Sequence, residues 1–585
     1  MAESGWMGHP RSYWTERLQQ EEYDVIIIGG GITGAGIARE ASLAGLKVAV
    51  LEGSDFAAGT SSRSTKLIHG GLRYLAQGHL RLVREAGSER AVLRRLAPHL
   101  VRPVPFVLPI YKGMQHGRMA MSAAIWLYDR LAGVAKEERR QTLSVHELLQ
   151  LHPALEQKEL LGGVLYHEYV TDDARLTLAT LQSASALGAV VLNDCPVRKL
   201  LVADGTLCGV IAHDLIDDRQ LVITGRLVVN AAGPWIEQVL ALEQTARPDR
   251  ADQSEAPTSA MPPAPPTVQA EVATAQDEVR GAASRVTHSR GIHLSFPAER
   301  LPLPHALAVQ TADRRLVFLI PKGEVTYVGT TDKRYAGDLH HPEVPAEEID
   351  YLLRIVNRLR PDAQLTEADV IGIWSGVRPL VTAAGSSAAQ DTKDVSREDE
   401  IWVSPGGLIT IAGGKLTAYR KMAERVLSHL RQTLESSGDW NRWQTLSARL
   451  PLYGAEQLPA VNQSQWWQSE ITRLSEQHNI GCADASALLD RFGDRAEAVL
   501  AYGSSARIDP HFPLLCAEIH YMVRHESANH LQDLIARRTE LGRFRGRELA
   551  SLIDAVSREM ALLLDWTEEQ REREVHSCQR ECHLV

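Results

Sequence analysis

The hydrophobic pattern near the start of the chain predicts a strand, a helix and a second strand in quick succession. Residues 23–28 (YDVIII) form a short apolar, β-branched run that ends at three glycines, residues 29–31. Apolar residues then recur at helical spacing, and residues 47–51 (KVAVL) form the next apolar run. This order is that of one βαβ unit, which takes about thirty residues.

Farther along, the pattern changes character. The segments GIHLSFP, RRLVFLIPKGEVTYVGTTD and ADVIGIWSGVRPL resemble strands of an antiparallel sheet, and from about residue 445 the periodicity is mostly helical. Between these regions and the βαβ unit, residues 244–285 are rich in Pro, Ala, Ser, Gln and Glu without an apolar period. Such a composition is typical of a disordered or loosely attached insert.

We therefore expect an α/β fold class and five regions. They are an N-terminal extension (1–22), a nucleotide-binding domain (23–243 and 400–440) with part of the next domain interleaved, the insert (244–285), a substrate-binding domain (286–399) and a C-terminal helical domain (445–585). The length of 585 residues agrees with a division, because single cores stop growing beyond about 250–300 residues.

Composition excludes some classes of function. Asp and Glu number 73 against 63 Lys and Arg, a formal net charge of −10, so we expect no general attraction to nucleic acid. The six cysteines are sparse, and no apolar signal-peptide core precedes them, which indicates free thiols in a reducing cytoplasm. Since no window of eighteen apolar residues occurs, any membrane contact is expected to be peripheral.

Three features leave alternatives open for that contact. The arginine-rich stretch 79–95 is interpreted as a solvated helix face, with an approach to anionic lipid as the alternative. Residues 119–134 (MAMSAAIWLYDRLAGV) fit an interfacial helix and a core-facing helix equally well. Trp6 and Trp14 raise the same question more weakly.

A group of metal-ligand side chains lies near the end of the sequence: His576, Cys578, Cys582 and His583. Their spacing is compatible with a metal site. They fall in a terminal tail, however, and such tails are often disordered. We therefore expect no metal site there.

The glycines of the βαβ unit carry the first chemical signal. Gly29, Gly31 and Gly34 follow a strand and open a helix, where a dinucleotide-binding fingerprint has to lie. Glu52 ends the second strand, at the place where a carboxylate binds ribose hydroxyls. The helix N-terminus then faces the phosphates. Glycine spacing by itself does not decide between NAD and FAD.

Several longer segments carry a family resemblance. They are GTSSRSTKLIHGGLRYL (59–75), TDDARL (171–176), NAAGPW (230–235), VGTTD (328–332), SGVRPL (375–380), GGKLTAYRKMAE (413–424) and MVRHESANHLQDLIARRTELG (522–542). In this order they resemble the aerobic, FAD-dependent glycerol-3-phosphate dehydrogenases. The resemblance covers nearly the whole chain, apart from residues 1–22 and 244–285.

The resemblance implies the glutathione-reductase-like, or amino-acid-oxidase-like, FAD fold, with the flavin ring between two domains. It implies that Thr60, Ser61 and Ser62 supply hydroxyl and N–H groups near the ring. Further cofactor contacts are implied for Gly233, Gly414, Lys415 and Thr417. The turn at residues 413–415 ends a strand and begins a helix, so its N–H groups can stabilise negative charge on the reduced ring.

Glycerol 3-phosphate is the substrate that the resemblance implies. We expect arginine to bind its phosphate group, because the planar guanidinium group matches the geometry of phosphate oxygens. Arg73 and Arg378 match family positions that line the substrate pocket, whereas Arg397 aligns less securely. Tyr74 and Lys415 are expected to hydrogen-bond the substrate or the flavin. For any single arginine the alternative is a surface ion pair.

The reaction, oxidation of a secondary alcohol to dihydroxyacetone phosphate, also requires a base for the hydroxyl proton. His69 is the first candidate because it neighbours Arg73, and His293 in GIHLSFP is the second. Arg378 completes the expected catalytic group. A structural role remains the alternative for either histidine.

The electron acceptor stays open between two branches of the family. Dehydrogenases work on the inner face of the cell membrane and reduce quinone, whereas related oxidases produce hydrogen peroxide from oxygen. We favour the membrane quinone, although residues 244–285 resemble an oxidase insert in position. The resemblance also suggests a homodimer. An amino-acid oxidase of the same fold and a flavoprotein without turnover are the alternatives. The pairing of Arg73 with Arg378 argues against the first, and the presence of both His69 and Arg378 argues against the second.

Overall fold

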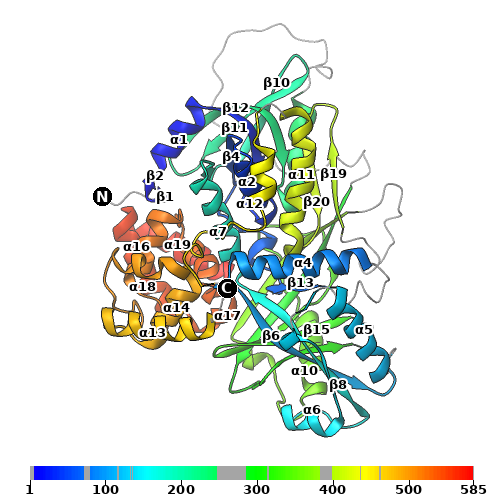
Figure 1. The fold of residues 1–585 in the computed structure, drawn as a ribbon. Helices are drawn as coiled ribbons and strands as arrows, with labels where there is room; N and C mark the ends of the chain where they lie inside the picture. The colour runs from blue at the N-terminus through cyan, green and yellow to red at the C-terminus, as the bar shows by residue number, and fades with distance from the viewer. Residues whose placement is uncertain are drawn as a thin grey trace.

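The computed structural model describes residues 5–70, 80–114, 117–131, 133–134, 136–246, 285–311, 315–381, 398–434, 437–459 and 463–583. Figure 1 shows three parts: a nucleotide-binding sheet with its helices at the top, a second sheet at the lower right and the C-terminal helices at the left. The three parts meet near the middle of the molecule.

The nucleotide-binding sheet is built on the predicted βαβ unit. β3 (Glu22–Ile28) and β4 (Val48–Leu51) pair in parallel, and α2 (Ile32–Leu43) connects them. Parallel pairing continues from β4 to β9 (Val190–Leu192) and from β3 to β12 (Arg219–Asn230). The remaining strands are β10 (Val197–Ala203), β11 (Thr206–Asp214), β19 (Asp399–Val403) and β20 (Ile409–Gly413).

Helices cover this sheet and bury its strands. This burial explains why the sequence of β3 is a continuous apolar run rather than an alternating pattern. α2 packs against α7 (Asp173–Ala186) and α11 (Tyr419–Leu434), and α12 (Trp440–Leu446) lies beside α2. α8 (Ile236–Thr245) follows the short helix η3 (Gly233–Trp235). Since α8 continues to Thr245, the predicted insert begins later than residue 244, and residues 247–284 lie outside the described part of the chain.

The expected antiparallel sheet is confirmed, and much of it comes from earlier in the chain than residue 286. Its strands are β5 (Leu67–Ile68), β6 (Val101–Tyr111), β7 (Gln141–Leu143), β8 (Leu160–Thr171), β13 (Val286–Pro297), β14 (Ala306–Gln310), β15 (Leu316–Lys322), β16 (Val325–Gly329), β17 (Lys333–Arg334) and β18 (Gly372–Val381). Pairing is antiparallel except where β14 meets β6 in parallel.

Four helices border the second sheet: α4 (Leu80–Leu96), α5 (Arg118–Leu131), α6 (Val145–Leu151) and α10 (Ala346–Leu359). α4 contacts both β6 and the short helix η7 (Leu416–Ala418) of the nucleotide-binding part, so it lies across the junction of the two sheets (Figure 1). Its arginines are not all on a solvated face. Arg90 is buried and pairs with Glu168 at 3.0 Å.

The C-terminal part has its own apolar core, formed by helices that reach the last described turn. These are α13 (Gln463–His478), α14 (Cys482–Phe492), α15 (Ala496–Leu500), α16 (Cys516–His525), the π-helical segment η9 (Asp533–Arg538), α17 (Leu541–Phe544), α18 (Ala550–Leu564) and α19 (Glu568–Glu581). The expectation of a disordered tail around Cys578 and Cys582 is wrong, because both thiols are buried in this core.

The N-terminal extension is also ordered from residue 5 onward. β1 (Gly5–Trp6) pairs with β2 (His9–Pro10), and α1 (Arg11–Gln20) packs on the nucleotide-binding sheet. Trp6 is 1% exposed and Trp14 is 4% exposed, so the idea that they meet a membrane is wrong. Within the described ranges, the structure contains no helix with the length and apolarity needed to cross a bilayer.

Candidate active site

The three fingerprint glycines allow β3, α2 and β12 to approach one another closely. Gly29 has a φ of +115°, and a Cβ there would lie 2.6 Å from the carbonyl oxygen of Ala231. A Cβ on Gly34 would lie 1.9 Å from the carbonyl oxygen of Gly29. Gly31 caps the N-terminus of α2. The first N–H groups of that helix therefore face the space beyond β3, where they can meet phosphate.

Glu52 follows β4 and borders the same space. Its Oε2 accepts a hydrogen bond from the Gly30 N–H at 2.7 Å, and its Oε1 accepts one from the Ser54 N–H at 2.9 Å. Burial raises the pKa of Glu52, and these two N–H groups act in the opposite direction. An ionised carboxylate has about four acceptor positions, so it can still receive ribose hydroxyls.

This space belongs to one large cavity of about 2050 Å³ between the two sheets. Typical small-molecule pockets measure about 300–1,000 Å³, so the cavity has room for a dinucleotide together with a small substrate. The nucleotide-binding part contributes Gly29, Gly31, Glu52, Gly233, Gly414 and Lys415 to its wall. The second sheet contributes Thr330, Asp332 and Arg378.

The Ser/Thr-rich turn forms η1 (Thr60–Ser62) on this wall. The Thr60 hydroxyl donates to the Val377 carbonyl at 2.5 Å, which ties the turn to β18. The Ser61 hydroxyl accepts from the Ile32 N–H at 2.9 Å and so fixes the turn to the start of α2. Ser62 is buried, and its Oγ has no hydrogen-bond partner among the described residues. The first two hydroxyls thus hold the wall together.

The glycine turn after β20 adopts the conformation that its sequence requires. Gly413 and Gly414 have φ values of +77° and +81°, which L side chains rarely adopt. The Thr417 hydroxyl accepts from the His69 N–H at 3.1 Å and donates to the His69 carbonyl at 3.2 Å. The turn and the first candidate base are therefore joined directly.

The two candidate bases occupy different environments. His69 lines the cavity, and its ring meets Phe318 edge-on at 6.3 Å between centroids. His293 is buried behind the wall, stacked on Trp374 at 4.7 Å, with its Nε2 2.9 Å from the hydroxyl of Thr65. Burial, with the charges of Arg378 and Lys66, holds the pKa of His293 well below its ordinary value.

Arg378, on β18, lines the cavity. Its Nη2 donates to the Thr330 hydroxyl at 3.1 Å, and its Nη1 lies 3.8 Å from Asp332 Oδ1. Arg315 approaches the same residue, because its Nη1 donates to the Asp332 carbonyl. Two guanidinium groups therefore gather at Asp332 on the cavity wall.

Polar residues on this wall that were not predicted from the sequence include Arg315, Arg63 and Thr65. Arg315 immediately precedes β15, so an arginine at the start of an apolar strand was the available signal. Arg73, Tyr74 and Arg397 lie outside the described residues, and their roles stay predictions. The roles given to the other predicted site residues stay predictions as well.

FAD fits the residues that are present. The fingerprint turn and the N-terminus of α2 would receive the phosphates, Glu52 would receive a ribose, and the cavity continues to the turn at Gly413 and Gly414. The fold and the site together define an FAD-dependent oxidoreductase.

Comparisons with known proteins assign the family. The family model "FAD dependent oxidoreductase" matches residues 24–420, and "C-terminal domain of alpha-glycerophosphate oxidase" matches residues 445–571. The chain is 35% identical to an aerobic glycerol-3-phosphate dehydrogenase of Bacillus subtilis (strain 168), over 97% of this chain and 96% of that protein. The chain belongs to the aerobic, FAD-dependent glycerol-3-phosphate dehydrogenase family, and FAD is its cofactor.

Two further relatives fit this assignment. An alpha-glycerophosphate oxidase of Streptococcus pyogenes serotype M1 is 32% identical, over 95% of this chain and 94% of that protein. The solved glycerol-3-phosphate dehydrogenase of Bacillus halodurans, complexed with FAD, is 30% identical with a TM-score of 0.75. That match covers 98% of this chain and 97% of the other. The family thus includes a dehydrogenase and an oxidase at similar identity to this chain.

Proposed function

We propose that this enzyme oxidises sn-glycerol 3-phosphate to dihydroxyacetone phosphate and that the electrons pass from FAD to a membrane quinone. The names of the relatives support the substrate. The observation that carries the proposal is the single cavity in which the nucleotide cradle, His69 and the Arg378–Arg315 pair lie together. The alternative is an oxidase that passes the electrons to oxygen.

The arginine pair is the proposed phosphate site. A phosphate ester brings about two negative charges, and guanidinium forks bind its oxygens bidentately. Thr330 and Asp332 hold Arg378, so little side-chain freedom is lost when the substrate binds. Arg73 and Arg397 are proposed to complete the site, with Tyr74 and Lys415 bonding the substrate hydroxyls or the flavin.

His69 is the proposed base. When bound, FAD accepts the hydride from the carbinol carbon. The ring of His69 takes the hydroxyl proton, so that the C–O bond becomes a carbonyl and the product is the ketone. Thr417 fixes the backbone of His69, which holds the ring on the cavity wall. His293 stays the second candidate, because Thr65 connects it to the cavity.

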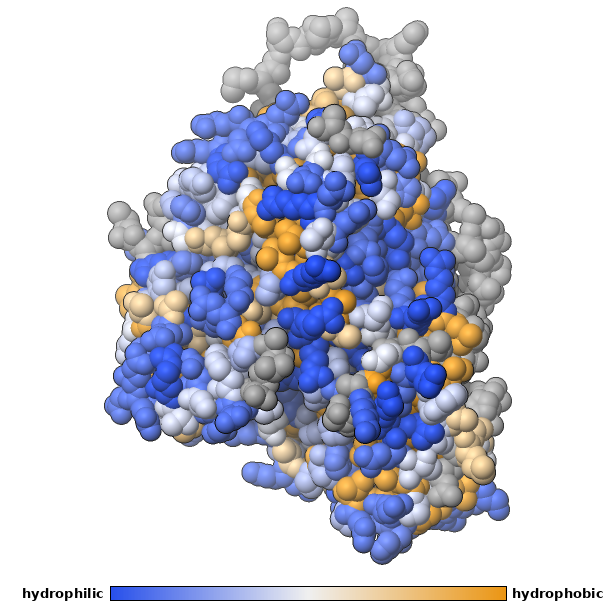
Figure 2. Space-filling model, in the orientation of Figure 1, coloured by the Kyte–Doolittle hydropathy of each residue, from blue (hydrophilic) through white to orange (hydrophobic). Residues whose placement is uncertain are grey.

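The proposed membrane contact lies on α5 and the start of α4, two helices that touch each other. Met119 is 84% exposed and Trp126 is 50% exposed, and Leu80 on α4 is 47% exposed. Arg130 lies over the Trp126 ring at 5.6 Å, and Arg84 is exposed on α4. Apolar groups beside arginines fit the interface of an anionic membrane. Hydrophobic side chains reach the surface near α5 on the face drawn in Figure 2.

The first experiment mixes the purified flavoprotein with glycerol 3-phosphate in the absence of oxygen. We expect rapid bleaching of the flavin band, and no bleaching by glycerol or by amino acids. Fast re-oxidation by a quinone analogue with slow peroxide release supports the dehydrogenase, and the reverse supports the oxidase. Failure of glycerol 3-phosphate to bleach the flavin would overturn the substrate.

Two further measurements test the location and assembly that we propose. Vesicles containing an anionic lipid should bind the wild-type protein and release a Trp126→Ser variant, whereas equal binding by both removes α5 from the proposal. A homodimer is proposed from the family resemblance. Light scattering of the detergent-solubilised protein gives its mass and decides between a dimer and a monomer.

A further inference from the structure

One segment of the chain, residues 52–66, separates the cavity from the C-terminal helical part. One side of this segment lines the cavity, through residues that include Glu52, Ser54, Thr60, Ser61 and Thr65. Its other side forms buried ion pairs with residues that lie about 470 to 520 positions later in the sequence. These ion pairs hold the segment at three places.

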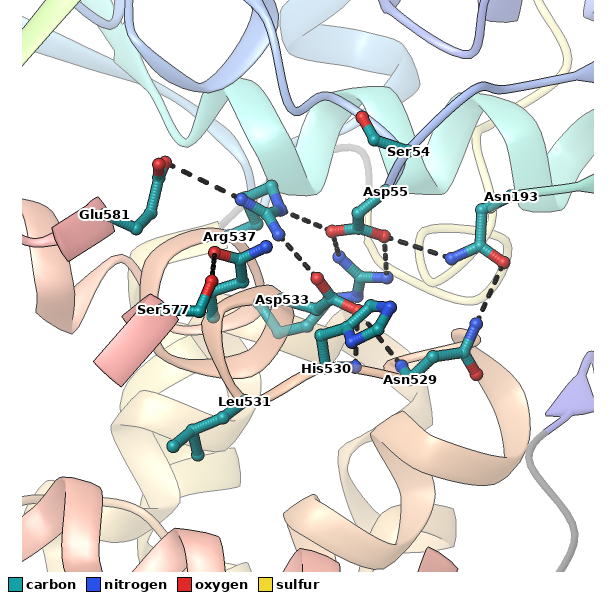
Figure 3. Close-up of polar contacts among 12 residues, drawn as sticks. Ser54, Asp55, Asn193, Asn529, His530, Leu531, Asp533, Arg537, Ser577 and Glu581 are labelled. Atoms are coloured by element: carbon teal, nitrogen blue, oxygen red, sulfur yellow. Dashed lines mark hydrogen bonds and ion pairs between the residues drawn. The ribbon is translucent and has the colours of Figure 1, made fainter. Parts of the chain in front are cut away.

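The first place is Asp55, directly after Ser54. Arg538 binds both carboxylate oxygens of Asp55, at 2.6 and 2.7 Å. Arg537 binds one of these oxygens, as Figure 3 shows. Burial would raise the pKa of Asp55, but the two arginines outweigh that effect and lower it. Asn193 adds a hydrogen bond at 3.3 Å from the end of β9. Asp55 is thus a fixed, charged anchor.

The second place is Arg63, one residue after η1. Its Nη2 donates to both oxygens of Glu581 on α19, at 2.8 and 3.0 Å, and its Nη1 donates to the His340 carbonyl at 2.8 Å. Arg543 also binds Glu581, and Arg537 lies 3.7 Å from it. One buried carboxylate therefore serves three arginines.

The third place is Lys66, whose ammonium group is 1% exposed. It lies 2.6 Å from Glu540 in the C-terminal part, 2.5 Å from Asp173 and 3.1 Å from the Ser62 carbonyl. Glu540, Asp173 and Asp172 are close enough together to resemble a cation site. Lys66 and Lys322 already supply the positive charge that these carboxylates require.

Movement of these anchors would directly change the wall of the cavity. Ser54 N–H binds Glu52, which also binds Gly30 in the fingerprint turn. Ser61, between the Asp55 and Arg63 anchors, holds the Ile32 N–H of α2. The hydrogen bonds that shape the nucleotide cradle are thus made by the same segment that the C-terminal ion pairs hold.

We infer that the C-terminal helical part is a working component of the FAD site, because its buried ion pairs keep residues 52–66 in the conformation that FAD requires. Glu581 is the positioning residue for the portion around Thr60 and Thr65. Glu581 does not line the cavity, so it does not contact the substrate. The inference concerns FAD binding and holds whichever substrate or electron acceptor the enzyme uses.

The test compares Glu581→Gln with Glu518→Gln. Glu518 is also a buried carboxylate, and it binds Arg491 at 2.7 and 2.9 Å within the C-terminal part. Among the described residues it forms no hydrogen bond or ion pair with residues 52–66. Glu581→Gln removes the negative charge from three arginines and Glu518→Gln removes it from Arg491, so both variants should lower the melting temperature. FAD is removed, and its dissociation constant is measured by flavin fluorescence. Hydrogen exchange of residues 52–66 is followed in the apoprotein.

We expect Glu581→Gln to raise the FAD dissociation constant by about tenfold or more and to speed exchange in residues 56–66. Glu518→Gln should leave both quantities close to those of the wild type. Equal weakening of FAD by the two variants would overturn the inference, and so would a folded Glu581→Gln protein with unchanged affinity. If Glu581→Gln does not fold, Glu581→Asp replaces it, because the shorter carboxylate loses the two-point contact with Arg63 but keeps the charge.

Discussion

The two walls of the cavity are built on different principles. The nucleotide-side wall depends on the conformation and close packing of the backbone. It has glycine at residues 29, 34 and 414, where a Cβ would collide with neighbouring atoms or where φ is positive. The substrate-side wall depends on side-chain charge, with Arg378 and Arg315 gathered at Asp332. A change to the first wall should therefore remove the cofactor, whereas a change to the second should spare the cofactor and remove the substrate.

The largest expected effect is at Gly34. The added methyl group of Gly34→Ala would lie 1.9 Å from the Gly29 carbonyl oxygen, so α2 and β3 must separate. We expect purified Gly34→Ala protein to lack flavin, measured as the ratio of visible to ultraviolet absorbance. Gly117→Ala is the control, because no described residue has an atom within 4 Å of the added atom. Normal flavin content in Gly34→Ala would show that this wall tolerates side chains.

Arg378→Ala should be next in size and should act on the substrate. Losing one partner of a charged, hydrogen-bonded pair costs about 2–5 kcal/mol, which corresponds to a fall in kcat/KM for glycerol 3-phosphate of roughly 30- to 5,000-fold. Flavin content should stay normal. Arg378→Lys should recover part of the loss, since it restores charge but not the fork. Loss of flavin together with activity would contradict the division between the walls.

The two histidines can be separated by substitution with asparagine. His69→Asn should lower kcat by about 10²- to 10⁴-fold and remove the limb of the pH–rate profile that reports the base. His293→Asn should mainly lower the melting temperature, because that ring is buried against Trp374. If His293→Asn removes the limb and His69→Asn does not, the proton leaves through Thr65 and the roles are exchanged.

A smaller effect is expected behind the nucleotide-side wall, at His530. Burial would lower its pKa, but the hydrogen bond to Glu574 and the charges of Asp194 and Asp533 raise it to about 10. Because this value exceeds the ordinary 6.5, the stabilisation is complete below pH 6.5 and is lost as pH rises toward 10.

The corresponding measurement is the melting temperature across that pH range. We expect His530→Gln to lower it by about 2–4 °C at pH 6 and to have less effect near pH 10. Glu574→Gln should act in the same direction, since it removes the negative charge that lies 2.8 Å from His530 Nδ1. A pH-independent difference between the wild type and His530→Gln would exclude an ionised His530 as the cause.

The same contrast explains what the sequence allowed us to predict. Backbone requirements appear as glycine spacing and as apolar runs, so the βαβ unit and the antiparallel strands were recognised from residues 23–51 and from the later β segments. Arg315 was missed because an arginine before a strand looks like a surface residue until Asp332 is placed beside it. Arg63 was missed because its partner, Glu581, is 518 positions away. Trp6 and Trp14 suggested a membrane contact because the strand and helix that bury them leave no clear local pattern.

The long separation between Arg63 and Glu581 bears on how the protein is made. At a synthesis rate of about 5–20 residues per second, roughly 25–100 seconds pass between the emergence of the two residues. In the last part of that interval, once Gly414 has been made, the nascent chain contains every glycine of the cradle, while Glu581 has not yet been translated. We expect ribosome-bound chains that end before α19 to capture FAD poorly. FAD would then bind late, and only to full-length molecules.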